Sequence, residues 1–273
     1  MTALVGPLLL VGCGKMGGAL LDGWLQRGLA AADAYVVEPD GALREALRER
    51  HGVVALAEPK ELPTELAPRA LVFAVKPQAM DAVLPAYESL ARSGAVVLSI
   101  AAGTPIARFE AAFGERTPVA RAMPNTPAAI GRGVSVLIAN ARVSAAQREL
   151  CEALMAAVGA VHWIDDEELM HAVTALSGGG PAYVFLLIEA LAKAGISHGL
   201  PAALAWPLAR ATVAGSGALA ASSEAPVEVL RQNVTSPGGT TQAALEALLA
   251  DDGVHPLFHR AIAAAARRSR ELG

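Results

Sequence analysis

The chain has 273 residues, a formal net charge of −4, 53% hydrophobic residues and 18% charged residues. The composition excludes a disordered chain, and the length predicts roughly two domains. The mild acidity argues against a nucleic-acid partner, which normally requires a basic face. Two cysteines, Cys13 and Cys151, cannot build a disulfide framework, so we expect a reducing, cytoplasmic location.

The high apolar content raises the question of a membrane span, which needs about 20 apolar residues with few charges. The most apolar helical stretch, Ala182–Ile196, carries Glu189 and Lys193. We therefore expect no membrane span, and we expect the excess apolar surface to form a subunit interface.

Up to about Trp163 the sequence alternates short apolar runs with amphipathic runs. The expected strands are Leu8–Val11, Ala34–Glu38, Leu71–Ala74, Val96–Ile100, Val119–Ala122, Val134–Ile138 and Ala160–Trp163. The expected helices include Gly17–Gln26, Ala42–Arg50, Met80–Leu90 and Thr104–Ala112. Strands separated by helices predict an α/β Rossmann domain with a doubly wound, mainly parallel sheet over residues 1–163.

After Asp165 the pattern becomes entirely helical, which predicts an all-α domain over residues 164–273. The expected helices are Asp166–Leu176, Pro181–Ile196, Pro201–Ala221, Pro226–Val234, Thr240–Ala250 and His255–Leu272. Several begin with proline, which is favoured at the first helical position. Pro207 lies inside the third helix and predicts a kink or a break there.

The strongest early motif is Gly12-x-Gly14-x-x-Gly17, which follows a strand and opens a helix and includes Lys15 and Met16. In this context the glycines allow a tight turn, close approach of a pyrophosphate and close packing of helix on strand. The motif predicts a dinucleotide site, the alternative being a structural glycine turn.

Glu38 ends the second expected strand. An acidic residue there usually accepts hydrogen bonds from the adenosine ribose, which favours NADH. A 2′-phosphate would be repelled unless an arginine such as Arg44 compensates. The alternative is that Glu38 is a solvated strand end.

Two further loops follow strand ends, where α/β proteins bind ligands. The first, Ala74-Val75-Lys76-Pro77-Gln78, could place Lys76 toward a cofactor or a substrate anion, or Lys76 could be an ordinary surface lysine. The second presents Asn125 between two prolines, which indicates either a rigid polar contact or a turn.

The helical half contains two glycine-rich openings. Ser177–Pro181 indicates a close contact of helices or of a helix with a ligand. Ser236-Pro237-Gly238-Gly239-Thr240-Thr241 combines glycine N–H groups with hydroxyls at a helix start, which favours a small carboxylate site over ordinary capping. His255 and His259 have i, i+4 spacing without a carboxylate partner, so we expect no metal site.

These motifs together resemble the pyrroline-5-carboxylate reductase family over nearly the whole chain. The resemblance rests on Val11–Gly17, Ala74–Gln78, Arg121–Pro127, Thr174–Tyr183 and Leu230–Thr241. It implies NADPH- or NADH-dependent reduction of 1-pyrroline-5-carboxylate to L-proline, the final step of proline biosynthesis. It also implies a homodimer formed by exchange of helices, assembly into larger rings such as decamers, and an active site that uses both subunits.

The resemblance also implies roles for individual residues. The cofactor would contact Gly12, Gly14, Lys15, Met16, Gly17, Glu38, Ala74, Val75, Lys76, Pro77 and Asn125. The substrate would contact Ser177, Ser236, Gly238, Gly239 and Thr240. Thr241 would point its hydroxyl at the ring nitrogen, and Glu224 would act near the substrate through water.

Three positions depart from the family pattern. Gly179 stands where a serine is usual, Ala211 where a glutamine is frequent, and Glu38 where NADP-preferring members offer serine, asparagine or arginine. Two other functions stay open from the residues alone. One is a related dehydrogenase for a hydroxy acid, with Lys193 as the available lysine, or for another cyclic imine. The other is a dinucleotide sensor without catalysis.

Overall fold

The computed structural model describes residues 4–272, and its contacts divide the chain into two compact units. The first unit comprises the chain up to Gly178 together with the segment from Ala266 onward, and the second comprises Gly179–Ala265. Each unit is described by itself below.

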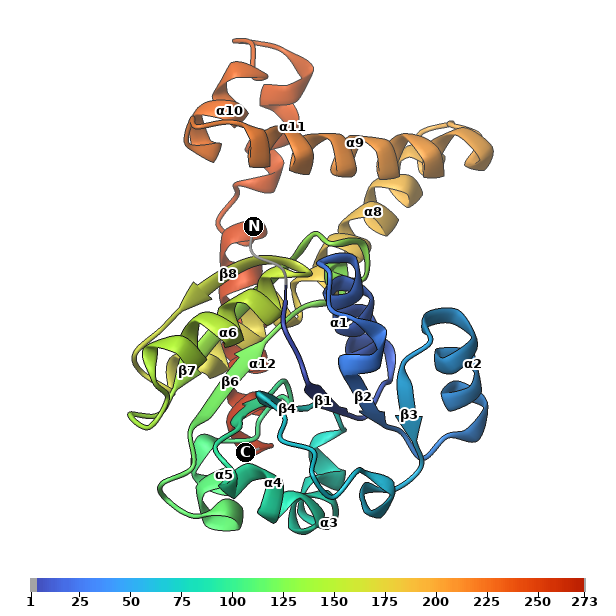
Figure 1. The fold of residues 1–273 in the computed structure, drawn as a ribbon. Coiled ribbons are helices and arrows are strands. Elements are labelled where there is room, and N and C mark those ends of the chain that lie inside the picture. The colour runs from blue at the N-terminus through green and yellow to red at the C-terminus, as the bar shows by residue number, and fades with distance from the viewer. Residues whose placement is uncertain (1–3, 273) are drawn as a thin grey trace. The chain divides into compact units, whose positions relative to one another are not determined.

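The first unit is built on one eight-stranded sheet (Figure 1). Its strands are β1 Leu8–Val11, β2 Ala34–Val37, β3 Val54–Leu56, β4 Ala70–Phe73, β5 Val96–Ser99, β6 Val119–Met123, β7 Gly133–Ala139 and β8 Gly159–Trp163. Their order is β3-β2-β1-β4-β5-β6-β7-β8, and every neighbouring pair is parallel except β6 with β7. The expected doubly wound, mainly parallel Rossmann sheet is confirmed.

Helices cover both faces of this sheet. Their bounds are α1 Lys15–Gln26, α2 Gly41–His51, α3 Met80–Val83, α4 Glu88–Arg92, α5 Ile106–Phe113, α6 Ala145–Ala156 and α7 Leu169–Val173. Alternate residues of β1 join different cores, because successive side chains of a strand point to opposite faces. Leu8 and Leu10 pack with α1, α2 and α6, whereas Leu9 and Val11 pack with α3, α4, α5 and α7. Burial on both faces explains why the strands lack polar alternation.

Two expected helices are interrupted or shortened by proline. The run Met80–Leu90 is divided into α3, a 3₁₀ turn over Leu84–Tyr87 and α4. Pro85 lacks the N–H that would continue the α-helical ladder. The run expected from Thr104 begins at Ile106 instead, because Pro105 is the extended N-cap residue and disfavours helical geometry in the residue before it. Strand β3 was not expected at all.

The second unit is entirely helical among its described residues. It holds α8 Gly180–Ser197, α9 Ala202–Ser222, α10 Val227–Asn233, α11 Thr240–Leu248 and the first part of α12 Val254–Glu271. Of the kink or break predicted at Pro207, the break is wrong, since α9 continues through this residue. Pro207 lies only in the second turn, so a single helical bond, to the Ala203 carbonyl, is lost.

The second unit leaves most of its large apolar side chains exposed. Its buried residues are only Ala192, Ala205 and Ala209, within the described chain. The side chains of Phe185 and Leu186 on α8 are 62% and 63% exposed. An exposed apolar surface of this kind is typical of a subunit interface.

One stretch within the described residues, Leu169–Ser197, is long and apolar enough to cross a membrane by length and composition alone. The expectation that no segment meets this criterion is therefore wrong. A single helix of this kind is weak evidence of a membrane span, because the core helix of a soluble protein passes the same test.

The division between the units lies later than the boundary expected after residue 163. Residues 164–178 stay with the sheet because Met170 is 2% exposed in the core beneath β4 and β5. The end of α12 also returns to the first unit, where Ser269 Oγ lies 2.9 Å from His171 Nδ1.

Candidate active site

The glycine-rich loop follows β1 at the point where the strand order of the sheet reverses. The neighbours of β1 are β2 and β4, and open α/β sheets bind ligands at such a switch point, outside the carboxyl ends of the strands. Gly12 has φ +83°, and a Cβ built there would lie 2.9 Å from Val75 Cγ1. A Cβ on Gly17 would lie 2.6 Å from the Gly12 carbonyl oxygen. Both positions therefore require glycine.

The start of α1 offers unpartnered N–H groups to an anion. The N-cap residue is Gly14, which has no side chain that could cap the helix. The space beside it is open, since nothing lies within 4 Å of a Cβ built on Gly14. Among residues 4–272, the N–H groups of Lys15, Met16 and Gly17 have no hydrogen-bond partner. Free N–H groups and the positive end of a helix dipole suit a pyrophosphate. These residues fit the dinucleotide that the motif predicts.

Glu38 is held at the end of β2 by two backbone hydrogen bonds. Its Oε2 accepts the N–H of Cys13 at 2.8 Å, and its Oε1 accepts the N–H of Asp40 at 3.0 Å. The residue is only 8% exposed. The alternative of a solvated strand end is therefore wrong.

Cys13 lies in the glycine-rich loop but is not a nucleophile. Burial, reinforced by the negative charges of Glu38 and Asp22, raises the pKa of its thiol to about 12. The reactive form of cysteine is the thiolate, so the thiol is inert at neutral pH.

The loop after β4 packs directly against the glycine-rich loop. The N–H of Ala74 donates to Val11 O at 2.8 Å, and Ala74 Cβ would lie 3.3 Å from a Cβ on Gly17. Val75 and Pro77 are half-buried and Lys76 is exposed. Since β1 and β4 are adjacent and parallel, this loop and the glycine-rich loop lie side by side at the carboxyl ends of these strands.

Asn125 and Ser177 are joined to each other rather than left free. The Asn125 side chain donates from Nδ2 to Ser177 O at 3.1 Å and accepts the Val134 N–H at 2.9 Å. Ser177 Oγ donates to Val173 O within a π-helical turn, Thr174–Gly178. Such turns occur frequently at functional sites. In this arrangement Asn125 fixes the loop after β6 to the end of the first unit.

The sequence reasoning missed a role for Arg121. Its side chain is 7% exposed and forms an ion pair with Glu167, whose Oε1 also accepts the Ile106 N–H at 2.9 Å. This cluster ties β6, α5 and the segment after β8 together. The signal in the sequence is the arginine itself, since a cation within an otherwise apolar strand needs a partner.

In the second unit, the loop before α11 presents a second uncapped helix start. The N-cap residue is Gly239, which has no side chain that could cap the helix. The N–H groups of Thr240, Thr241 and Gln242 have no hydrogen-bond partner within the described chain. Ordinary capping by Ser236 or Thr240 is therefore absent here. The N–H of Gly238 donates to Gln242 Oε1 at 2.7 Å, and that of Gly239 donates to Ser236 O at 3.0 Å.

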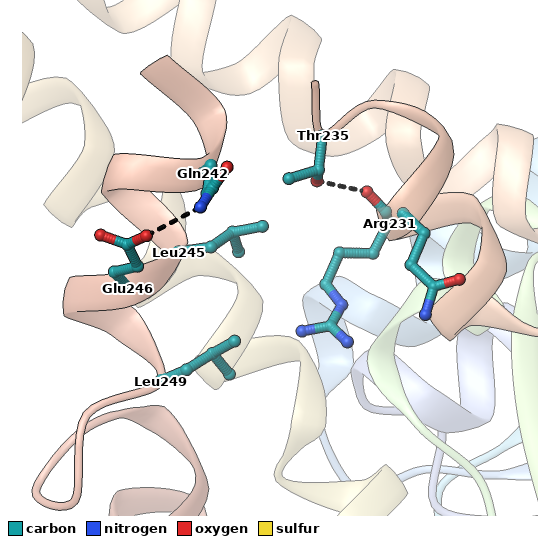
Figure 2. Close-up of a pocket in the computed structure, with 7 residues that line it drawn as sticks. Arg231, Thr235, Gln242, Leu245, Glu246 and Leu249 are labelled. Carbon is teal, nitrogen blue, oxygen red and sulfur yellow. Dashed lines mark hydrogen bonds between the residues drawn. The ribbon is translucent and has the colours of Figure 1, made fainter. Parts of the chain in front are cut away.

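A cavity of about 490 Å³ lies beside this loop, between α10 and α11 (Figure 2). Its lining residues are Arg231, Gln232, Thr235, Gln242, Leu245, Glu246 and Leu249. Gln242 Nε2 donates to Glu246 Oε1 at 3.0 Å, and Thr235 Oγ1 donates to Arg231 O at 2.7 Å. The five residues expected at the substrate in this loop, Ser236, Gly238, Gly239, Thr240 and Thr241, do not line this cavity.

The predicted site residues thus form two groups, one in each unit. In the first unit, the structure brings the glycine-rich loop, Glu38 and Ala74–Pro77 together at one edge of the sheet. In the second unit, Thr240 and Thr241 are exposed on the first turn of α11, and Glu224 is exposed in the loop before α10.

Comparisons with known proteins agree with both groups. Residues 8–103 match the model of the family described as NADP oxidoreductase, coenzyme F420-dependent. Residues 167–272 match the family described as pyrroline-5-carboxylate reductase dimerisation. The exposed apolar helices of the second unit therefore lie within the part of the chain that matches a dimerisation domain.

Two relatives that match over nearly their whole length are both pyrroline-5-carboxylate reductases. The pyrroline-5-carboxylate reductase of Pseudomonas aeruginosa is 40% identical, covering 97% of this chain and 96% of the relative. The Synechocystis protein of the same name is 39% identical, covering 97% of both chains.

Solved structures give the same answer. The pyrroline-5-carboxylate reductase of Coxiella burnetii superimposes with a TM-score of 0.92 at 33% identity, covering 98% of both chains. The Plasmodium falciparum enzyme, solved with NADP bound, gives 0.83 at 29% identity and covers 97% of both chains. By sequence, fold and the layout of its two motif groups, the chain belongs to the pyrroline-5-carboxylate reductase family.

Proposed function

We propose that this chain reduces the C=N bond of 1-pyrroline-5-carboxylate to give L-proline, with NADPH or NADH as hydride donor. The observation that carries the proposal is the pair of uncapped helix starts in a chain of this family. One start, at α1, suits a pyrophosphate, and the other, at α11, suits a small carboxylate.

The nicotinamide cofactor, when bound, supplies a hydride to the imine carbon. The N–H groups of Lys15, Met16 and Gly17 hold the pyrophosphate through backbone contacts. Val75 and Pro77 give the nicotinamide ring a half-buried surface. The role of these residues is to orient the ring and to exclude water, which is a proximity effect.

The second unit supplies the substrate contacts other than Ser177, which belongs to the first unit. The carboxylate binds at Ser236–Thr240, where the N–H groups of Thr240 and Thr241 have no partner within the described residues and can donate to it. The hydroxyl of Thr241 hydrogen-bonds the ring nitrogen. An iminium nitrogen keeps its proton as hydride reaches carbon, so a hydrogen-bonding hydroxyl is sufficient and no strong acid is needed. Glu224 acts through water, and Ser177 contributes from the π-helical turn.

The proposal extends to assembly and location. The chain forms a homodimer through α8 and α9, whose apolar side chains are exposed, and the dimers assemble further, with a decamer as the expected size. It works in the cytoplasm in the last step of proline synthesis. The hydroxy-acid alternative loses support because Lys193, its candidate lysine, is exposed and paired with Glu189.

The first test is oxidation of NADPH and of NADH with 1-pyrroline-5-carboxylate. We expect turnover and L-proline as product. Binding of nucleotide without turnover would favour the sensor alternative or another imine. 1-Pyrroline, which lacks the carboxylate, should bind far worse than the full substrate, and equal affinity would contradict the carboxylate site.

Thr241→Val removes the hydroxyl of the side chain and keeps the shape of the side chain. We expect kcat/KM to fall by about tenfold or more, as for loss of a hydrogen bond to a charged group, while the Kd for NADPH stays unchanged. Thr241→Ser, which keeps the hydroxyl and the backbone donor, is the matched control and should retain activity. Full activity of Thr241→Val would remove the hydroxyl from the mechanism.

Gly17→Ala tests the cofactor loop. The added methyl group would meet the Gly12 carbonyl at 2.6 Å, so we expect nucleotide affinity to fall by about tenfold or more. Gly18→Ala is the control, because its nearest neighbour beyond the local backbone would lie 3.9 Å away. Equal affinity of the two variants would contradict the role of Gly17.

A further inference from the structure

The end of β2 holds two charged side chains, Glu38 and Arg44, with opposite consequences for the cofactor. A carboxylate at this place normally binds the ribose 2′-hydroxyl and repels a 2′-phosphate, whereas an arginine accommodates the phosphate. The usual rule therefore makes opposite predictions from the two residues. Their hydrogen bonds decide between them.

Both carboxylate oxygens of Glu38 accept hydrogen bonds from the protein backbone. One carboxylate oxygen accepts the N–H of Cys13 in the glycine-rich loop, and the other accepts the N–H of Asp40. Its own N–H donates to Leu56 O at 3.0 Å. Each oxygen keeps a second lone pair, but the residue is 8% exposed, which leaves little surface for a ribose. The carboxylate connects β2 to the loop that receives the pyrophosphate.

Arg44 uses only one of its three guanidinium nitrogens in hydrogen bonds to the described part of the chain. Its Nη1 donates to the carbonyl oxygens of Glu38 and Pro39, each at 2.8 Å. Within residues 4–272, Nε and Nη2 have no hydrogen-bond partner and Arg44 forms no ion pair. Nη2 would lie 3.6 Å from a Cβ on Gly41, at the start of α2. The guanidinium is thus held in place through Nη1, while Nε and Nη2 can still donate to a ligand.

A guanidinium in this state is suited to a phosphate. Arginine donors match phosphate oxygens in a two-point arrangement. A side chain already held by backbone carbonyls loses less freedom when it binds. The two acidic residues nearest to Arg44 in sequence, apart from Glu38, have partners of their own. Asp40 Oδ1 caps α2 by accepting the Leu43 N–H at 3.0 Å, and Glu45 pairs with Arg48 across 3.3 Å.

We propose that Arg44 binds the 2′-phosphate of NADPH and that Glu38 is a positioning residue for the glycine-rich loop rather than a ribose ligand. The inference rests on the proposed function, because it assumes that the dinucleotide binds at this loop. It makes NADPH the preferred cofactor, in contrast to the preference for NADH that Glu38 indicates from sequence alone.

The test measures binding without turnover, in the full-length enzyme. The Kd values of NADPH and NADH are measured by the change in nicotinamide fluorescence, with no imine present. We expect the unaltered chain to bind NADPH about tenfold more tightly than NADH. Adenosine 2′,5′-bisphosphate should compete better than AMP, which isolates the 2′-phosphate from the rest of the cofactor.

Two variants then separate the roles. Arg44→Ala should weaken NADPH by about tenfold or more and leave NADH within about twofold. Arg50→Ala is the matched control on the same helix, since Arg50 is exposed and pairs with Asp22 across 3.4 Å. Glu38→Gln should weaken both cofactors by a similar factor, because it removes one acceptor for a backbone N–H.

Three results would overturn the inference. They are tighter binding of NADH by the unaltered chain, equal losses for both cofactors in Arg44→Ala, and a selective gain of NADPH affinity in Glu38→Gln. Circular dichroism shows whether Glu38→Gln is folded, and Arg44→Ala alone decides the matter if it is not. Failure of turnover leaves these binding ratios unaffected, so the two proposals fail separately.

Discussion

The two units of this chain bury their apolar side chains in different ways. In the first unit both faces of the sheet are closed, with Phe73, Trp24 and Phe109 at most 1% exposed. In the second unit only three alanines are buried among the described residues, and Phe185 and Leu186 face outward. The first unit completes its own core, whereas the second presents an apolar surface that requires another protein surface to cover it.

The largest effect is expected from opening the core of the first unit. The Phe73 ring packs on Tyr87, Phe109 and Phe113 at centroid distances of 5.5–6.0 Å. Phe73→Ala should lower the free energy of unfolding by about 3–5 kcal/mol, measured by urea denaturation. Phe185→Ala is the control in the second unit, and at concentrations where the chain is monomeric it should cost far less. Equal losses in the monomer would remove the contrast between the units.

A somewhat smaller effect is expected from the buried cation of the first unit. Glu167→Ala leaves the 7%-exposed Arg121 side chain without its counter-charge. We expect a loss of about 3 kcal/mol, the low end for a broken buried pair, because Glu167 is itself one third exposed. Urea denaturation measures it. Glu168→Ala, which removes an exposed partner 3.8 Å from Arg270, should be nearly neutral. A neutral Glu167→Ala would show that Arg121 finds another partner.

The second unit should respond in association rather than in folding. Phe185→Asp places a charge on the exposed face of α8, and we expect the association free energy to weaken by about 2 kcal/mol, measured by sedimentation equilibrium. Ala111→Asp adds the same charge at an exposed position of α5 in the first unit and should leave assembly unchanged. An unchanged assembly for Phe185→Asp would place the interface elsewhere.

The last effect is absent at neutral pH, appears only in alkali, and belongs to the first unit alone. Burial raises the thiol pKa of both Cys13 and Cys151 from 9.0 to about 12. Between these two values the unfolded chain releases protons that the folded chain keeps, so stability falls as pH rises above 9. Each cysteine should contribute about 1.4 kcal/mol per pH unit in that window. The decline should be shallower in Cys151→Ala, and an unchanged slope would contradict the raised pKa.

Much of the fold was predictable because local pattern and tertiary structure agree. Seven strands and the change to an all-helical pattern follow from apolar runs and proline-led helices. Strand β3 was missed because three residues, Val54–Leu56, carry too little pattern. The antiparallel pairing of β6 with β7 was not predictable, since strand direction depends on how the chain crosses the sheet. The contacts place the segment 164–178 with the sheet, although the dimerisation family matches from residue 167. The helical pattern of this segment does not record the contacts of Met170 and Glu167 with the first unit.

The sequence by itself determined the family, the sheet type and the residues at the two glycine-rich loops, because glycine spacing and strand–helix alternation are local properties. Only the tertiary structure decided how those residues are used. Glu38 has the same identity in either role, but its carboxylate accepts the N–H of Cys13, 25 residues earlier in the chain. Arg44 is likewise one of many arginines until two carbonyl oxygens fix it at the end of β2. The bond from Cys13 to Glu38 joins segments distant in sequence and depends on the packing of β1 beside β2. The Arg44 bonds span only five and six residues, and they depend on the path of the chain from β2 into α2, which the spacing of apolar residues does not encode.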